Sequence, residues 1–334
     1  MSTNCATPQG TARYRERFAA RAARELFREQ QGLVLSSIGI GTYLGDADEA
    51  TDLSYANSVV RAVQLGVNVI DSAANYRFQR SERSIGTALS ELTGSHGVAR
   101  EELIICTKGG YLPFDGEPPR NPREYVEENF VKPGIATFED IVGGGHCMTP
   151  AYLQSQLDQS LKNMGLECVD VYYIHNPESQ LGYVSESEFY ERLRLAFERL
   201  EANRQEGKLK FYGVASWNGF RVAHDSGKHH SLVRMVEIAR ELGGEQHGFR
   251  FIQLPFNLSM REAHRLDNET LDGEVMTVVD AAQRLGVTVV ASATMLQGRH
   301  EPEAAIYFVG STAGVTTGLI GMSKVEHVEE NLSF

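Results

Sequence analysis

Short apolar runs recur along the chain, and amphipathic stretches lie between them. The runs are rich in β-branched residues and almost continuously apolar, which is typical of parallel strands buried on both faces. The stretches between them have the spacing of helices that bury one face. The pattern predicts strands over 36–43, 67–70, 103–107, 169–174, 211–216, 251–256, 287–293 and 316–321. It predicts helices over 52–65, 82–93, 151–164, 187–206, 231–242 and 274–285.

The alternation of strands and helices indicates an α/β protein. Eight strands in one chain of 334 residues favour a (β/α)8 barrel, a TIM barrel of a single domain. A doubly wound sheet is the alternative. It is disfavoured because no Gly-x-Gly-x-x-Gly follows the first strand, where Gly39-Ile40-Gly41 precedes Thr42 and Tyr43.

The N-terminal segment has a pattern of its own. Tyr14, Phe18, Ala22 and Leu26 recur every four residues, which predicts an amphipathic surface helix within 11–30. Acidic residues in the same stretch argue against a transit peptide, which is poor in acid. We therefore divide the chain into an N-terminal segment with this helix, residues 1–32, and a barrel, residues 33–334.

A long irregular stretch, residues 109–149, follows the third predicted strand. A loop of this length in a compact domain is usually functional or disordered. It leaves the barrel at the face where active sites are built. Phe114, Tyr125 and Phe130 either line a substrate pocket or pack within the loop, and the sequence leaves both interpretations open.

Composition narrows the classes of function. The chain has 44 acidic and 32 basic residues and a formal net charge of −12. Such a surface repels nucleic-acid phosphates and anionic membranes, so neither is an expected partner. No run approaches the ~18 apolar residues of a membrane span, and residues 1–10 lack the apolar core of a signal peptide.

The cysteines show no metal-ligand or redox-motif spacing. We predict that Cys5, Cys106, Cys147 and Cys168 are reduced thiols of a cytoplasmic protein, with no disulfide frame and no zinc site. His146 precedes Cys147 in the long loop and could contact substrate or a metal. No second pair stands at metal-ligand spacing, so no metal is expected.

Ionisable residues of three kinds close three consecutive predicted strands. Asp71 ends the second strand, Lys108 the third and His175 the fourth, while Tyr76 follows Asp71 by five residues. Because the carboxyl ends of barrel strands meet at one mouth, we expect these side chains to lie together. Each alone has an ordinary interpretation, as a turn former, a solvated cation or a structural histidine. The four residues taken together favour a catalytic site over these structural interpretations.

The chemistry expected of the set is proton transfer. A free tyrosine has a pKa near ~10, too high for efficient proton transfer at neutral pH. The charge of Lys108 favours the phenolate, so we expect it to lower the pKa of Tyr76. Asp71 would pair with Lys108, and His175 could polarise a carbonyl oxygen or assist the proton relay.

These residues resemble the signature of the aldo-keto reductase family. That signature is an Asp-x-Ala-x-x-Tyr segment, then a strand ending in Lys and a strand ending in His. Here it reads Asp71-Ser72-Ala73-Ala74-Asn75-Tyr76, Cys106-Thr107-Lys108 and Tyr172-Tyr173-Ile174-His175. SERSIGTAL at 81–89, SLKNMGLECVDVYYIHNPE at 160–178 and GMSKVEHVEENL at 321–332 are similar to the family too, so the resemblance runs from about residue 33 to the C-terminus.

The resemblance implies a TIM barrel that binds NADPH and reduces aldehydes or ketones to alcohols, or runs in reverse. It implies that Tyr76 is the general acid and that Lys108 and His175 tune it. Asp71 would support Lys108, while the nicotinamide supplies hydride. Cofactor contacts are implied at Gly41, Thr42, Ser216, Asn218, Gln253, Ser292, Ser323, Lys324, His327, Glu330 and Asn331.

The same resemblance favours NADPH over NADH because basic groups near the last strand would meet the 2′-phosphate. Lys324 is one of them. His327 stands where many relatives carry Arg, and it is a weaker, pH-dependent partner. The expected partner is a small carbonyl or alcohol substrate, and the sequence yields no prediction of an oligomer.

Three features depart from the family pattern. The Ser-Asn pair expected after the fifth strand reads Ala215-Ser216, and Ser292 stands where an aromatic residue usually stacks on the nicotinamide. Only about 18 residues separate Gly298 from the last strand, near Thr317. These departures favour an alternative function, a nicotinamide-nucleotide-binding regulatory or accessory subunit with little turnover. The intact set of four ionisable residues favours the enzyme.

Overall fold

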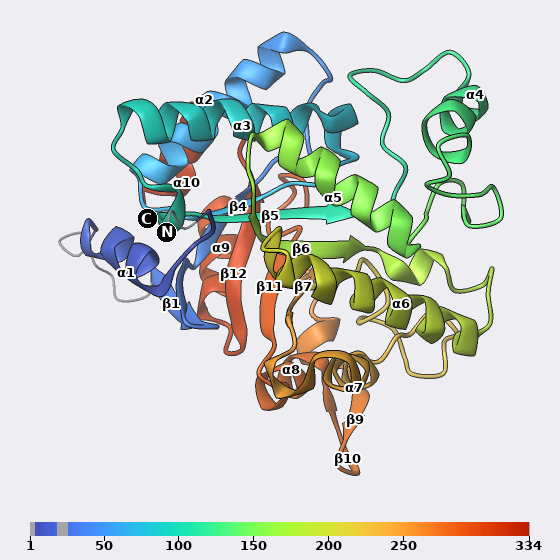
Figure 1. Ribbon diagram of the computed structural model, residues 1–334. Coiled ribbons are helices and arrows are strands. Elements are labelled where there is room, and N and C mark those ends of the chain that lie inside the picture. Colours follow the sequence, from blue (N-terminus) through green and yellow to red (C-terminus); the bar gives the residue numbers. More distant parts are fainter. Residues whose placement is uncertain (1–3, 19–25, 334) are drawn as a thin grey trace.

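The computed structural model describes residues 4–18 and 26–333. Within them, parallel strands close into a barrel in the order β11-β12-β3-β4-β5-β6-β7-β8 (Figure 1). The predicted (β/α)8 barrel is confirmed, and each predicted strand contributes to it. The strands are β3 (Ile38–Gly41), β4 (Val69–Asp71), β5 (Ile104–Gly109), β6 (Val169–His175), β7 (Leu209–Ala215), β8 (Phe249–Pro255), β11 (Thr288–Ser292) and β12 (Val315–Gly321).

Helices surround the barrel and bury their apolar faces against its strands (Figure 1). Side-chain caps fix where several of them begin: Asp48 accepts the N–H of Thr51 at 2.8 Å, and Thr149 accepts that of Tyr152 at 3.4 Å. The surrounding helices are α2 (Glu49–Gln64), α3 (Arg80–Ser95), α5 (Pro150–Met164), α6 (Glu186–Gln205), α7 (Leu232–Gly243), α8 (Val278–Leu285), α9 (Pro302–Ser311) and α10 (Val325–Asn331). No helix in the described ranges is long and apolar enough to cross a membrane.

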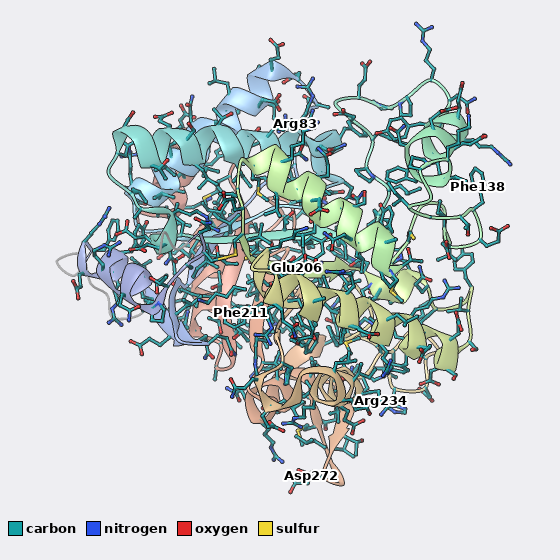
Figure 2. The ribbon with its side chains drawn as sticks, viewed as in Figure 1. Arg83, Phe138, Glu206, Phe211, Arg234 and Asp272 are labelled. Atoms are coloured by element: carbon teal, nitrogen blue, oxygen red, sulfur yellow. A yellow bond between two sulfur atoms is a disulfide. The ribbon has the colours of Figure 1, made fainter. Side chains whose placement is uncertain are left out.

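Two hairpins lie outside the barrel, each overlapping a segment that was predicted to be helical. Strands β1 (Phe27–Gln30) and β2 (Leu33–Ser36) pair around a turn at Gln31 and Gly32, both in the left-handed region, so residues 27–30 are not helical. Strands β9 (Asp267–Leu271) and β10 (Glu274–Thr277) pair in the same way, with Asp272 at the tip of the hairpin (Figure 2). The helix predicted over 274–285 therefore begins at Val278. In both places a reversing turn makes cross-strand pairing available, and that pairing replaces the helix.

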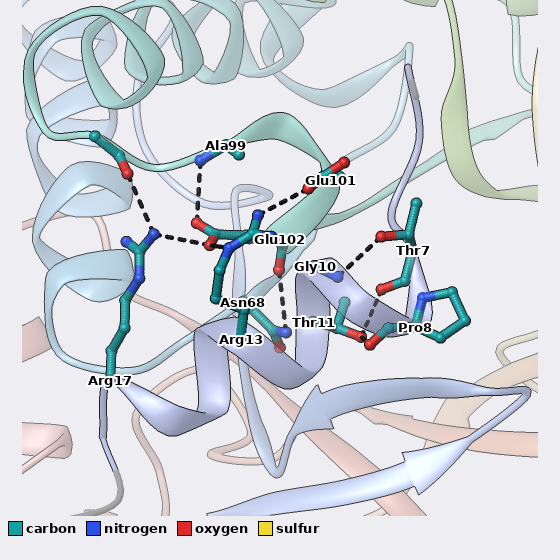
Figure 3. Close-up of polar contacts among 11 residues, drawn as sticks. Thr7, Pro8, Gly10, Thr11, Arg13, Arg17, Asn68, Ala99, Glu101 and Glu102 are labelled. Carbon is teal, nitrogen blue, oxygen red and sulfur yellow. Dashed lines mark hydrogen bonds and ion pairs between the residues drawn. The ribbon is translucent and has the colours of Figure 1, made fainter. Parts of the chain in front are cut away.

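The N-terminal segment crosses the end of the barrel at which the strands begin. Helix α1 (Pro8–Glu16) buries Tyr14, whose hydroxyl donates to the carbonyls of Val63 and Val67. Arg13 bonds Glu101 and Glu102, and Arg17 also reaches Glu102, which is fully buried (Figure 3). The helix predicted within 11–30 is thus shorter, and Ala22 lies outside the described residues. Leu33, Leu35 and Ala6 join the cluster that fills the barrel interior and close its N-terminal end.

A disulfide joins Cys5 to Cys168, with their Cα atoms 5.6 Å apart. The prediction that these two are reduced thiols is wrong, and the argument for a reducing, cytoplasmic compartment loses its support. The two residues are 163 positions apart and meet only because the N-terminal segment lies beside the start of β6, where the Ala6 N–H donates to Asp170 at 2.6 Å. Cys106 and Cys147 are buried free thiols.

The long loop lies beyond the C-terminal end of β5 and carries the short helix α4 (Pro122–Val126) (Figure 1). Its apolar side chains form a small core of their own with Tyr152 of α5. The ring of Tyr125 lies 5.4 Å from that of Phe114, and Phe130 lies 5.6 Å from Tyr152. Tyr125 thus packs within the loop, whereas Phe130 packs on α5 and Phe114 also stacks on Phe78, 6.3 Å away, so a pocket role for these aromatics stays a prediction. Phe138 lies at the loop's outer side (Figure 2).

Candidate active site

The four ionisable residues predicted to lie together do so at the C-terminal end of the barrel. Asp71 ends β4, Lys108 is the last residue but one of the neighbouring β5, and His175 ends β6, the next strand around the barrel. Tyr76 opens a short helical turn, Tyr76–Gln79, directly after β4. The order of strands in the barrel therefore assembles the group from segments 104 residues apart in the chain.

Lys108 occupies the centre of this group. Its Nζ donates to Asp71 Oδ1 at 2.5 Å and to the carbonyl of Ser72 at 2.7 Å. The same ammonium lies 4.8 Å from the centre of the Tyr76 ring. Gln253 in β8 donates to the second oxygen of Asp71 at 2.8 Å, so that both carboxylate oxygens have partners. Lys108 is thus fixed between a buried anion and the tyrosine.

The pKa of Tyr76 is raised above its ordinary value, in contrast to the expectation that Lys108 lowers it. Burial is the largest cause, and the charge of Lys108 opposes it without overcoming it. The sequence indicated that Lys108 would lie near Tyr76, but it did not show how strongly the site shields Tyr76 from solvent. The consequence is a phenol that keeps its proton at neutral pH and gives it up only to a strongly basic oxygen.

The remaining members have charges suited to that role. Burial lowers the pKa of Lys108, but Asp71 and Tyr76 together raise it above its ordinary value, so the side chain is an ammonium. Burial raises the pKa of Asp71, while Lys108 and Gln253 oppose this. Burial and the nearby Lys108 lower the pKa of His175 well below its ordinary value. His175 is therefore a neutral imidazole, with its ring 5.8 Å from that of Tyr76.

The backbone that follows Tyr76 is strained. Arg77, Phe78 and Gln79 all have left-handed φ angles, of 47°, 57° and 70°. Each costs roughly 1–2 kcal/mol for an L-residue with a Cβ. Surrounding contacts hold the turn in place: Arg77 bonds Asp52 at 2.5 Å, and Gln79 donates to the carbonyl of Phe114 at 3.0 Å. Strain that the surroundings hold in place is typical of a position that must be fixed precisely.

The residues expected at the nicotinamide end of a cofactor lie around the same mouth. Gly41 ends β3, Gln253 lies in β8 and Ser292 ends β11. Thr42 is fully buried, and its hydroxyl donates to Ser72 Oγ at 3.0 Å. Of these, two bond Asp71 of the ionisable group: Gln253 reaches its carboxylate, and the Thr42 hydroxyl lies 3.3 Å from its carbonyl oxygen.

The turn after β7 carries Ser216 and Asn218 and is held by Glu178. The carboxylate of Glu178 accepts the backbone N–H groups of Trp217 and Asn218 at 2.7 and 2.8 Å. Ser216 Oγ accepts the N–H of Gly219 at 2.9 Å. The sequence interpretation missed Glu178, although its position three residues after His175 placed it at the same mouth.

The residues expected at the adenosine end lie apart from the ionisable group. They sit after β12 and along α10, and β3 separates β12 from β4. Ser323 accepts a bond from Ser54 at 2.6 Å through its carbonyl, and Asn331 is buried. The others, Lys324, His327 and Glu330, are exposed and available to a ligand.

Two further tyrosines border the mouth and were not singled out from the sequence. The ring of Tyr43 lies 5.0 Å from that of Tyr76 and is 58% exposed. The ring of Tyr111 lies 5.2 Å from that of His175, and its hydroxyl pairs with Ser179 Oγ at 2.9 Å. Each comes within three residues of a strand end, which was the signal available for finding them.

Comparison with known proteins agrees with this geometry. Residues 37–239 match the model of the Aldo/keto reductase family. A Schizosaccharomyces pombe protein, provisionally named a voltage-gated potassium channel subunit beta, is 24% identical over 92% of this chain and 86% of its own length. L-glyceraldehyde 3-phosphate reductase of Escherichia coli is 27% identical over 80% of this chain. The alignment spans only 60% of that enzyme, and 49% of the NADH-specific methylglyoxal reductase of the same organism, which is 24% identical.

Solved structures show the same fold. The holo form of an aldo-keto reductase from Bacillus halodurans superposes with a TM-score of 0.60 at 16% identity, over 92% of this chain and 89% of that one. An aldo/keto reductase from Klebsiella pneumoniae, solved in complex with NADP and acetate, gives 0.59 at 15% identity over the same shares.

Proposed function

The chain belongs to the aldo/keto reductase family, and from that premise we propose that it reduces an aldehyde or ketone to the alcohol, or runs in reverse. The hydride would come from NADPH and the proton from Tyr76. The observation that carries the proposal is the half-buried Tyr76 beside the buried Lys108, with Asp71 fixing Lys108 and His175 facing the same tyrosine.

Proton transfer follows from the charges of the site. Tyr76 keeps its proton until a substrate oxygen gains negative charge, and then donates it. The phenolate that results lies beside the ammonium of Lys108, which stabilises it. Asp71 keeps that ammonium charged and in place. His175, as a neutral imidazole, can hydrogen-bond the substrate oxygen without competing for the Tyr76 proton.

The residues fit a nicotinamide nucleotide, which supplies hydride when bound. The turn of Trp217 and Asn218, fixed by Glu178, is preorganised for contact with a ligand. Two exposed basic side chains near the other end are suited to a 2′-phosphate, which favours NADPH over NADH. Gly41, Thr42, Ser216, Asn218, Gln253 and Ser292 would hold the nicotinamide end, and Ser323, Lys324, His327, Glu330 and Asn331 the adenosine end.

Small polar carbonyl compounds are the first substrates to test. The curated relatives include reductases named for L-glyceraldehyde 3-phosphate, methylglyoxal and 6-dehydroglucose. The mouth of this barrel presents tyrosine rings with polar edges, Tyr43 and Tyr111, which can pack against a carbon chain and hydrogen-bond its oxygens.

A nicotinamide-binding accessory subunit with little turnover is the second candidate function. Its support is the similarity to the protein from Schizosaccharomyces pombe that is named a channel subunit beta, over most of both chains. Ser216 and Ser292, which depart from the family pattern at the cofactor, also favour it.

The test is a titration with NADPH and with NADH while the emission of Trp217 is recorded. Trp217 is the only tryptophan, is 43% exposed, and lies in the turn that Glu178 fixes. Saturable quenching at micromolar NADPH, followed by NADPH oxidation with one of the three carbonyl compounds, is the expected result. Binding without turnover would favour the accessory subunit. No binding of either nucleotide, checked by calorimetry, would refute both.

A further inference from the structure

The two ends of the long loop meet beside the end of β6. The N–H of Leu112 donates to the carbonyl of Gly145 at 2.8 Å, and the N–H of Cys147 donates to the carbonyl of Gly110 at 2.7 Å. His146 lies between these bonds and is fully buried. The loop that begins directly after the Lys108 strand therefore returns to that strand and brings a histidine with it.

The hydrogen bonds of His146 fix the position of its proton. Nε2 lies 2.8 Å from the carbonyl oxygen of His175, and a carbonyl only accepts, so Nε2 carries the hydrogen. Nδ1 then accepts from the side-chain amide of Gln180 at 2.8 Å. The oxygen of that amide accepts from Arg192 at 2.7 Å. A guanidinium can only donate, so every donor and acceptor along this chain of bonds is determined.

Gly110 makes the contact between His146 and β6 possible. Its φ of +150° is unfavourable for other residues. A Cβ at this position would stand 2.8 Å from the His175 carbonyl oxygen and 3.0 Å from His146 Nε2. On the other side, the ring of Tyr111 packs edge-on at 5.2 Å from both histidine rings. The backbone of His175 is thus bonded by His146, and its ring is packed by Tyr111.

The chain turns sharply after His175, because Asn176 has a left-handed φ of 46°. The His175 carbonyl lies at this bend, where a fixed partner determines how the residue is oriented. We propose that His146 is a positioning residue: by bonding the His175 carbonyl it sets the imidazole of His175 against Tyr76. The inference rests on the proposed function of His175. It makes the base of the long loop part of the catalytic scaffold.

Two substitutions separate the contacts of His146. In His146→Gln the side-chain amide can reach the place of Nε2 and donate to the His175 carbonyl. In His146→Asn the shorter amide reaches only the place of Nδ1, so it keeps Gln180 and loses His175. His247→Asn is the control, because His247 is also buried but lies before β8, at the opposite end of the barrel.

We expect kcat to fall about 10- to 100-fold in His146→Asn, because small misplacements of catalytic groups have effects of that size. His146→Gln should recover most of the loss, and the NADPH dissociation constant should stay within about twofold in both. His247→Asn should lower the unfolding midpoint but leave kcat unchanged. Wild-type kcat in His146→Asn, or equal losses in His146→Asn and His146→Gln, would overturn the inference.

A second readout does not depend on turnover. The side-chain ¹⁵N spectrum of the histidines should show His146 at pH 7 as the neutral Nε2–H tautomer, assigned by its loss in His146→Gln. The His175 ring signals should shift in His146→Asn and stay in place in His146→Gln. A charged or Nδ1–H form of His146, or an undisturbed His175 in His146→Asn, would overturn the inference even if the protein proved to have no reductase activity. If His146 positions His175 but Tyr76→Phe turns over normally, the proposed function fails alone.

Discussion

Reducing the bond between Cys5 and Cys168 should lower the stability of the protein by an amount that the structure bounds. The bond closes a loop of 163 residues. The chain-entropy model gives about 17 cal/mol/K for a loop of that length, or about 5 kcal/mol at 25 °C. That figure is an upper value, since α1 keeps other attachments, including the Tyr14 hydroxyl bonds and the ion pairs of Arg13 and Arg17.

The expected shift in melting temperature follows from the size of the chain. An unfolding entropy of about 2.1 cal/mol/K per residue makes each kcal/mol worth roughly 1.5 °C for a protein of this length. Reduction should therefore lower the melting temperature by about 3–7 °C if the bond is worth 2–5 kcal/mol. Calorimetry with and without dithiothreitol measures this.

Cys5→Ser is the matched control for reduction. It should melt at the temperature of the reduced wild type and should not respond to dithiothreitol. Titration of thiols in denaturant without reductant should find the two free cysteines, Cys106 and Cys147, and not four. Four titratable thiols, or a melting temperature that reductant leaves unchanged, would refute the assignment of a stabilising bond.

Three further predictions concern the active site. Asp71→Asn should lower kcat by at least tenfold in steady-state assays and lower stability by about 3–5 kcal/mol in urea unfolding, because it leaves the Lys108 ammonium buried without its counter-ion. Gly110→Ala should destabilise the protein by about 1–3 kcal/mol in the same assay, since the added Cβ meets the His175 carbonyl at 2.8 Å; wild-type stability would contradict the packing. Burial lowers the pKa of His146 from 6.5 to about 4, so below pH 6.5 the unfolded chain gains a proton that the folded one lacks. The free energy of unfolding should therefore decrease as the pH is lowered from 6.5 to 4, by up to about 1.4 kcal/mol per pH unit from this residue. In His146→Gln the dependence of that free energy on pH should be shallower by about one proton.

The parts of the fold that local pattern controls could be predicted from the sequence. Continuous apolar runs marked every barrel strand, and because parallel strands share one mouth, the ends at Asp71, Lys108 and His175 had to meet. Amphipathic spacing predicted the surrounding helices from α2 to α8, although not α9 or α10. This worked because each of these choices depends on neighbours within a few residues.

Features that depend on long-range packing were missed. The pairing of Cys5 with Cys168 depends on the path of the N-terminal segment beneath the barrel, which no spacing encodes. The sign of the Tyr76 pKa shift depends on burial, which outweighs the visible cation. Residues 274–277 have a helical pattern but pair with β9, because a turn at Asp272 brings the two strands together. Glu178 acts through backbone amides 39 and 40 residues away.

The role of Tyr76 as proton donor is the central claim, and Tyr76→Phe tests it most directly. The measurement is steady-state NADPH oxidation with the best carbonyl substrate, alongside NADPH binding followed through Trp217, with Tyr307→Phe on exposed α9 as the control. General acid catalysis contributes about 10²–10⁴-fold, so kcat should fall by at least about 100-fold while the NADPH dissociation constant changes less than about twofold. The control should match the wild type. Unchanged turnover in Tyr76→Phe would contradict the account.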